Sequence, residues 1–144
     1  MGSELDRLVT VGQLQAVEPN TEQARALMRQ AQLHLTAANA ILDVDGVSAY
    51  SLLYESARKS LTALLALRGY RPTRTGGHRV IAIACAELAS DELRPLLITF
   101  ERMREVRNQL AYPSPDSLAR DPQDVAEDLS KAYRIVSECA ALIT

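Results

Sequence analysis

The fold is decided by residues 47–69, which read V-S-A-Y-S-L-L-Y-E-S-A-R-K-S-L-T-A-L-L-A-L-R-G. Apolar side chains recur there every three or four residues, the spacing of an α-helix with one buried face. The inward-facing set comprises Tyr50, Leu53, Ala57, Leu61, Leu64 and Leu65. Gly69 is expected to end this helix, because glycine readily adopts the left-handed conformation that ends many helices. The stretch therefore predicts a long helix from Val47 to Arg68.

The segment before it predicts a second long helix, antiparallel to the first. Asn20 and Gln23 have the spacing of a capping box, and a helical period then continues to about Leu42. Residues 43–46 break the helix before the next one begins. The inward positions are Ala24, Leu27, Ala31, Leu35, Ala38 and Ile41.

A loop and a short helix come after the central stretch. Residues 71–77 contain Pro72, Gly76 and Gly77, a composition typical of a loop. The short helix begins at His78 and is apolar nearly all round, which implies burial against the bundle or a partner. Its apolar residues are Val80, Ile81, Ile83, Ala84 and Leu88.

Two more long helices complete the pattern. Ser90 can cap the next helix, and Pro95 suits a first helical turn, so a fourth main helix is predicted from Pro95 to Tyr112, with Pro113 and Pro115 ending it. The last helix is predicted to have Asp121 as its N-cap and Pro122 at its first position. Its inward residues are Val125, Leu129, Ala132, Val136, Ala140 and Ile143.

The sequence thus predicts an all-α fold, an antiparallel four-helix bundle with a short inserted helix. Residues 3–17 add a short or frayed N-terminal helix, which Gly12 weakens. No strand pattern, repeat or low-complexity tract is recognised. We expect a single domain over residues 1–144, with an N-terminal extension at 1–19 and a core bundle at 20–144.

Charge is unevenly distributed, although the formal net charge is only −2. That value excludes the uniformly cationic surface of many nucleic-acid-binding proteins. Residues 56–86 nevertheless contain no acidic side chain, whereas the segment after Pro115 is mostly acidic. The acid-free stretch either contacts RNA phosphates by charge or pairs with the acidic last helix of the same or a second protomer. Its basic residues are Arg58, Lys59, Arg68, Arg71, Arg74 and Arg79.

The remaining composition points to a cytoplasmic protein without membrane association, metal or cofactor. Cys85 and Cys139 lie in apolar helical surroundings without metal-ligand spacing, and we expect both to be buried and inert. No apolar run reaches the roughly 18 residues of a membrane span. Residues 1–6 lack the basic and apolar parts of a secretory signal.

The most informative polar residues lie in F-E-R-M-R-E-V-R-N-Q-L-A-Y-P, residues 100–113. Its apolar residues at helical spacing are Phe100, Met103 and Leu110, and the stripe that they form passes through Arg107. Burying a guanidinium without partners is costly, so this position indicates paired charge, an anionic ligand or a partly open cleft. The residues that line a neighbouring stripe are Arg104, Asn108 and Tyr112.

Residues 102–113, R-M-R-E-V-R-N-Q-L-A-Y-P, resemble the motif helix of the HEPN superfamily of small bacterial helical bundles. Residues 50–72, with the T-G-G-H loop at 75–78, share this resemblance, which extends from about Glu22 to the C-terminus. HEPN proteins carry a motif of arginine, a polar residue, a few intervening residues and histidine. The resemblance implies a metal-independent endoribonuclease whose site forms where two protomers meet.

By this resemblance Arg107 is the motif arginine and Asn108 is the polar residue after it, whereas Tyr112 stands where the motif histidine would be. RNA cleavage by 2′-hydroxyl attack needs proton transfer, and an imidazole titrates near neutrality. A phenol has a reference pKa of about 10 and is a poor base at neutral pH. The candidate catalytic residues are therefore Arg107, Asn108 and Tyr112, with His78 as a second source of an imidazole.

Each candidate also has a structural interpretation. Arg104 and Arg107 either bind phosphate, which arginine forks match, or form a buried network that fixes helix packing or a dimer interface. Glu101 and Glu105 are the nearby salt-bridge partners in that second case. His78 can instead cap the next helix or help bind an anion at its N-terminus.

Other polar residues are expected to serve the fold. His34 is predicted to be a hydrogen-bonded core or interface histidine. Tyr50 and Tyr54 are predicted to pack in the core with their hydroxyls tethered at its boundary. The acidic residues expected in the first turn of the last helix, where they favour its dipole, are Asp124, Glu127 and Asp128.

These observations predict a HEPN-like domain that acts on or binds RNA, as an endoribonuclease or as part of a toxin-antitoxin or defence system. It would act as a homodimer whose facing Arg107 and Asn108 pairs contact an RNA phosphate, Arg107 stabilising the developing phosphorane charge. Two alternatives stay open: a non-catalytic module that binds a nucleotide or a partner such as a nucleotidyltransferase or antitoxin, and a dimerisation scaffold without ligand. The phosphate-binding candidates are Arg71, Arg74, Arg79, Arg104 and Arg107.

Overall fold

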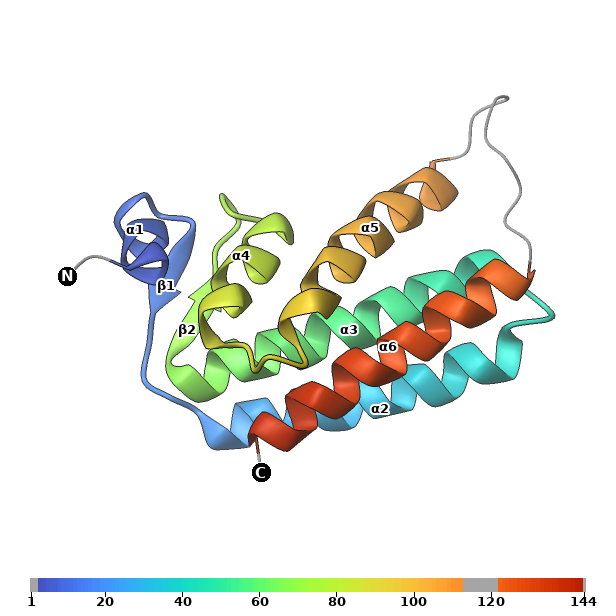
Figure 1. Ribbon diagram of the computed structural model, residues 1–144, viewed down its shortest axis with the longest axis horizontal. Coiled ribbons are helices and arrows are strands. Elements are labelled where there is room, and N and C mark those ends of the chain that lie inside the picture. The colour runs from blue at the N-terminus through green and yellow to red at the C-terminus, as the bar shows by residue number, and fades with distance from the viewer. Residues whose placement is uncertain (1–2, 113–121, 144) are drawn as a thin grey trace.

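The computed structural model describes residues 3–112 and 122–143 (Figure 1). Within these ranges lie six helices and a two-stranded sheet. The helical architecture confirms the predicted all-α fold. In chain order the elements are α1 (Glu4–Thr10), β1 (Leu14–Ala16), α2 (Thr21–Ile41), α3 (Gly46–Arg68), β2 (Tyr70–Pro72), α4 (Arg79–Leu88), α5 (Arg94–Ala111) and α6 (Pro122–Ile143).

Helix α3 is the centre of the fold, and α2, α4, α5, α6 and β2 all pack against it. Asp45 caps its N-terminus by accepting a hydrogen bond from the Ser48 N–H at 3.1 Å. Gly69 ends the helix with a φ of 88°, a left-handed conformation that favours glycine. The predicted boundaries of this helix are confirmed to within one residue.

Helices α2 and α6 lie alongside α3 (Figure 1). The Asn20 side chain accepts a hydrogen bond from the Gln23 N–H at 2.9 Å, which caps α2 where the sequence predicts. Small side chains then face the neighbouring helices and allow close packing. The fully buried alanines of α2 are Ala24, Ala31 and Ala38.

The prediction that no strand is present is wrong at two short segments. β1 and β2 pair antiparallel, with Gln15 opposite Arg71, so β2 occupies the start of the segment expected to be a loop. Gly12, with a φ of 77°, turns the chain out of α1 toward β1. Strands of three residues are too short to display the alternation by which strands are recognised.

Helices α4 and α5 cover a different side of α3 from α2 and α6 (Figure 1). α4 contacts α1, α3 and α5, which explains its almost uniformly apolar sequence. α5 begins at Arg94 with Pro95 in its first turn, as predicted. The helix stops expected at Pro113 and Pro115 and the cap expected at Asp121 lie outside the described residues.

Of the three acidic residues expected in the first turn of α6, Asp124 lies there, and the dipole role expected for Glu127 and Asp128 is wrong. Asp128 lies beyond the first turn of α6 and is only 4% exposed. Its carboxylate accepts hydrogen bonds from the Tyr50 hydroxyl at 2.7 Å and from Arg102 Nη2 at 2.8 Å. Lys131 Nζ lies 3.9 Å from the same carboxylate. We call these four residues the Asp128 network; it links α3, α5 and α6 and pairs a charge that burial would otherwise penalise.

Both cysteines are buried, as predicted. Burial raises the pKa of the Cys85 thiol, and it raises the pKa of Cys139 to about 12. A thiol with a raised pKa stays protonated and is a poor nucleophile. No helix in the described part of the chain combines the length and the apolar character needed to cross a bilayer.

Candidate functional site

The polar residues of α5 differ in burial. The buried stripe of this helix passes through Phe100, Met103 and Val106. Arg107, seven residues after Phe100, lies on the same side of the helix. Arg104 and Arg107 are half-buried, and Asn108 is exposed. Tyr112 comes after the last helical residue and is 79% exposed. The two arginines are therefore partly covered by the protein, whereas the motif-position tyrosine projects into solvent.

Both arginines lie near Tyr54 of α3, which is fully buried. Its ring stacks on Phe100 with centroids 5.2 Å apart and planes 8° from parallel. The guanidinium carbon of Arg107 lies 5.9 Å from the centroid of the Tyr54 ring, within the range of a cation–π contact. Packing of the two rings thus fixes a surface against which Arg107 rests.

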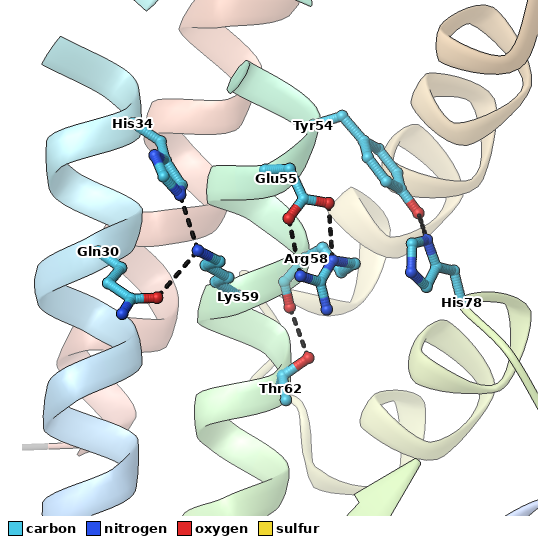
Figure 2. Close-up of polar contacts among 8 residues, drawn as sticks. All are labelled: Gln30, His34, Tyr54, Glu55, Arg58, Lys59, Thr62 and His78. Atoms are coloured by element: carbon cyan, nitrogen blue, oxygen red, sulfur yellow. Dashed lines mark hydrogen bonds and ion pairs between the residues drawn. The ribbon is translucent and has the colours of Figure 1, made fainter. Parts of the chain in front are cut away.

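His78, which precedes α4, joins this group through its ring. Its Nδ1 lies 3.0 Å from the Tyr54 hydroxyl, and the ring planes are tilted by 33° (Figure 2). Partial burial lowers the pKa of His78, and the positive charges of Arg58, Arg107 and Arg104 lower it further against the opposing effect of Glu55. Burial raises the pKa of the Tyr54 phenol, so Tyr54 keeps its proton at neutral pH.

Two ion pairs flank the rings. Arg58 and Glu55, one turn apart on α3, form a bidentate pair at 2.7 and 2.8 Å (Figure 2). Arg104 Nη2 lies 3.3 Å from Glu101 Oε2 on α5. Partial burial raises the pKa of Glu55, but the hydrogen bond and charge of Arg58 outweigh it and hold that pKa below its ordinary value.

These residues form a cluster, which we call the arginine cluster. Its three arginines and two glutamates leave one net positive charge while His78 is neutral. In the described part of the chain, the buried side-chain nitrogen and oxygen atoms without a hydrogen-bond partner are Glu101 Oε1, Arg104 Nε and Arg107 Nε. All three belong to the cluster, and such atoms are costly unless a ligand, water or second chain pairs with them. Its members are Tyr54, Glu55, Arg58, His78, Glu101, Arg104 and Arg107.

A family model described as the HEPN domain matches residues 24–142. The chain belongs to the HEPN superfamily. No curated protein and no solved structure gave a significant match. The resemblance inferred from the α3 and α5 segments is therefore confirmed at the level of the family.

Within this HEPN domain, the other predicted phosphate-binding residues lie apart from the ring contacts just described. Arg71 is exposed in β2 and donates a hydrogen bond to the side chain of Gln15 in β1. Arg74 is exposed in the turn after β2, and Arg79 is exposed at the start of α4. The structure thus brings His78 to the pair of α5 arginines and leaves the three arginines of residues 71–79 on the surface.

His34 makes a contact of its own on the α2 side of α3. Lys59 Nζ lies 2.8 Å from His34 Nε2 and donates a hydrogen bond to Gln30 Oε1 at 2.9 Å (Figure 2). Partial burial lowers the pKa of His34, and the charge of Lys59 lowers it further. His34 is half-buried and hydrogen-bonded, in keeping with the structural role predicted for it.

Sequence reasoning missed Tyr54, Glu55 and Arg58 as members of the arginine cluster. Tyr54 was expected only as a core residue, and Arg58 only as part of a basic stretch. The available signal was their spacing, because residues 54 and 58 lie one turn apart on the same face of α3. Nothing in the sequence relates that face to Arg104 and Arg107, which lie more than 40 residues further along the chain.

Proposed function

We propose that this HEPN domain binds RNA by holding a backbone phosphate at Arg104 and Arg107. The observation that carries the proposal is the pair of buried, unpartnered Nε atoms of these two arginines beside the Tyr54 ring. A guanidinium presents several N–H donors in a planar fork that matches phosphate oxygens. A phosphate oxygen would pair the Nε groups that the described residues leave without partners.

The balance of charge favours an anion over a neutral ligand. Among the described residues, Glu101 uses one oxygen on Arg104 and leaves Oε1 without a partner, and Glu55 is occupied by Arg58. Within the same ranges, the guanidinium of Arg107 rests on the Tyr54 ring and hydrogen-bonds only to Asn108, at 3.4 Å. That last contact is long and involves a neutral amide. Arg107 therefore has most of its donors available for a ligand, and the single negative charge of a backbone phosphate complements the net positive charge of the cluster.

The proposal includes a homodimer formed through α5. The exposed side of this helix carries Ile98 and Glu105, seven residues apart, and Asn108 lies one turn after Glu105. The partner would cover Ile98, which is 78% exposed. Arg107 lies nine residues after Ile98, on the opposite side of α5 and against Tyr54, so a dimer through this face would share Asn108 and leave Arg107 to its own protomer.

The position of His78 favours metal-independent cleavage in addition to binding. The lowered pKa keeps its imidazole neutral near pH 7, so it can accept a proton. The Tyr54 oxygen can accept a hydrogen bond from Nδ1–H, which leaves Nε2 as the base. Nε2 would take the 2′-hydroxyl proton as that oxygen attacks phosphorus. The bond to the 5′-oxygen breaks, that oxygen takes a proton from water, and a 2′,3′-cyclic phosphate forms.

The test uses an end-labelled single-stranded RNA in the presence of EDTA, with a 2′-O-methyl copy of the strand to measure binding without cleavage. Arg107→Ala is expected to weaken binding about 10- to 100-fold, the effect of losing a charged hydrogen-bonding group. His78→Ala is expected to lower the cleavage rate by about 100-fold or more while preserving binding. Arg94→Ala, an exposed arginine on the same helix, is the matched control.

The outcomes separate the alternatives. Binding that Arg107→Ala does not weaken overturns the phosphate site. Binding that depends on Arg107 without any cleavage favours a non-catalytic module that holds RNA, a nucleotide or a partner. If Tyr112→Phe abolishes cleavage and His78→Ala does not, the proton is transferred by the motif-position tyrosine instead.

A further inference from the structure

The N-terminal segment, residues 3–17, lies outside the part of the chain that matches the HEPN family model. It contains α1 and β1, which lie beside α4 and β2 (Figure 1). β2 ends directly before the turn at residues 73–77, and α4 begins directly after His78. The segment therefore contacts the chain on both sides of His78.

On the β2 side, the segment holds the turn through Thr73. The Thr73 hydroxyl donates a hydrogen bond to the Gly12 carbonyl oxygen at 2.6 Å, and the Thr73 N–H donates one to the Gln13 carbonyl oxygen at 3.3 Å. The same hydroxyl accepts a hydrogen bond from the Gly76 N–H at 3.4 Å. One side chain thus links the N-terminal segment to both ends of the turn.

The turn also meets the segment at Gly76. A Cβ atom at this position would overlap the Gln13 carbonyl oxygen, which belongs to the backbone and cannot rotate away as a side chain would. Glycine is therefore needed for the two backbones to approach so closely. Any larger residue at this position would push the turn away from the segment.

On the α4 side, α1 packs against the helix that follows His78. A seven-residue helix is too short to be stable by itself in water, so α1 depends on burial of its apolar residues Leu5 and Leu8 against the rest of the domain. The Gln13 N–H donates a hydrogen bond to the Leu8 carbonyl oxygen at 3.0 Å. Docking of α1 on α4 therefore also fixes Gln13, the residue that contacts the turn.

The position of the His78 ring depends on this backbone. The side chain of His78 is exposed and makes no capping hydrogen bond at the start of α4. Its ring contacts Tyr54, with Nδ1 3.0 Å from the hydroxyl (Figure 2). A side chain with few contacts of its own lies where its backbone places it, and the turn and α4 set that place.

We propose that the N-terminal segment positions His78 against Tyr54 for the chemistry of the arginine cluster, through its contacts with Thr73 and Gly76. The inference rests on the proposed function, in which His78 is the base. Thr73 and Gly76 are then positioning residues, because they act through His78 and do not touch the RNA. A displacement of about 1 Å in a reacting group can lower a rate about 100-fold, so small movements of the turn affect cleavage more than binding.

The first measurement observes His78 directly, by NMR of the intact chain with isotope-labelled histidine. His34 is the other histidine of the chain and serves as an internal reference. Gly76→Ala and Thr73→Val are each expected to shift the His78 imidazole signals. They should also raise its pKa toward the ordinary value of about 6.5, as the ring moves away from its partly buried place beside the arginines. The His34 signals should stay unchanged.

The matched controls are another glycine and a conservative change. A Cβ atom at Gly46 meets nothing within 4 Å, so Gly46→Ala should leave both histidines as in wild type. Thr73→Ser keeps the hydroxyl that bonds to Gly12 and should restore the wild-type His78 signals. A general loss of stability would not distinguish serine from valine at this position in the His78 spectrum.

The second measurement is RNA cleavage in EDTA. Gly76→Ala and Thr73→Val should lower kcat about 10- to 100-fold and change KM by less than about twofold, since the phosphate-binding arginines are untouched. Gly46→Ala and Thr73→Ser should cleave at about the wild-type rate.

Failure of this inference and failure of the proposed function have different signatures. If Gly76→Ala and Thr73→Val leave the His78 signals and pKa as in wild type, the inference is overturned, even where the melting temperature falls. It is also overturned if variants with displaced His78 signals cleave RNA as fast as wild type. If His78 is displaced as expected but wild-type protein does not cleave RNA, the proposed cleavage fails and the positioning of His78 by the N-terminal segment stands.

Discussion

Tyr50 and Tyr54 lie one turn apart on α3, and both are fully buried, yet their hydroxyls meet opposite situations. The Tyr50 hydroxyl bonds to Asp128, whose carboxylate is also paired with Arg102 and approached by Lys131. The Tyr54 hydroxyl bonds to His78, beside two arginines with unpartnered buried nitrogens. A network in which every buried charge has a partner within the protein stabilises the fold. A network that contains buried N–H donors without a hydrogen-bond partner is suited to binding a ligand.

Removing Asp128 is the strongest test of whether the Asp128 network stabilises the fold. Asp128→Ala removes the buried carboxylate that accepts hydrogen bonds from the Tyr50 hydroxyl and from Arg102. We expect a loss of about 3 kcal/mol in the free energy of unfolding, because losing one member of a buried ionic network is costly. Urea denaturation measures this loss. Asp124→Ala, which removes an exposed carboxylate from the first turn of α6, should cost less than about 1 kcal/mol.

Inorganic phosphate should stabilise the protein through the arginine cluster. At a phosphate concentration about ten times its Kd, ligand linkage adds about 1.4 kcal/mol to the free energy of unfolding. Thermal melts in phosphate and in chloride at equal ionic strength measure this effect. Arg107→Ala should remove the phosphate effect and barely alter the melt in chloride. An equal phosphate effect in wild type and Arg107→Ala would mean that phosphate binds elsewhere.

Removing each tyrosine hydroxyl in turn compares the two networks with one chemical change. Tyr50→Phe deprives a buried carboxylate of a hydrogen bond and should destabilise the protein by about 1–2 kcal/mol. Tyr54→Phe should cost about half as much, because His78 is an exposed residue whose ring can bond to water instead. An equal decrease in the free energy of unfolding in the two variants would show that the Tyr54 hydroxyl is held by its partner as firmly as the Tyr50 hydroxyl.

The sequence predicted the helices well because each carries its own local signals. Asn20 and Gly69 cap or end helices by contacts within a few residues, so no tertiary information is needed. The two α5 arginines could be recognised for the same reason, since their spacing and their resemblance to the HEPN motif are local. Arg107 was placed on the stripe of Phe100 and Met103, and it rests on the same Tyr54 ring as Phe100, although its side chain is only half-buried.

Contacts between distant segments could not be predicted. His78 and Tyr54 are 24 residues apart, and their hydrogen bond depends on how the loop after β2 returns along α3. Asp128 and Tyr50 are 78 residues apart, so a carboxylate that looked like a dipole partner proved to be buried. In both cases the sequence shows the residue type and its helical face, and the tertiary packing alone decides which partner that face meets.

The smallest effect expected concerns pH and separates His78 from His34. Both pKa values lie below the ordinary value, so each histidine resists protonation in the folded state more than in the unfolded chain. Their stabilising contribution is present above a pH of about 6.5 and is lost as the pH falls through the folded pKa. Wild-type protein should therefore lose more stability between neutral and mildly acidic pH than either His78→Gln or His34→Gln.

Bound phosphate should remove only the part of this pH-dependent loss that comes from His78, because an anion beside the ring favours its protonation. If phosphate changes the pH dependence of His78→Gln as much as that of wild type, the anion does not lie next to His78.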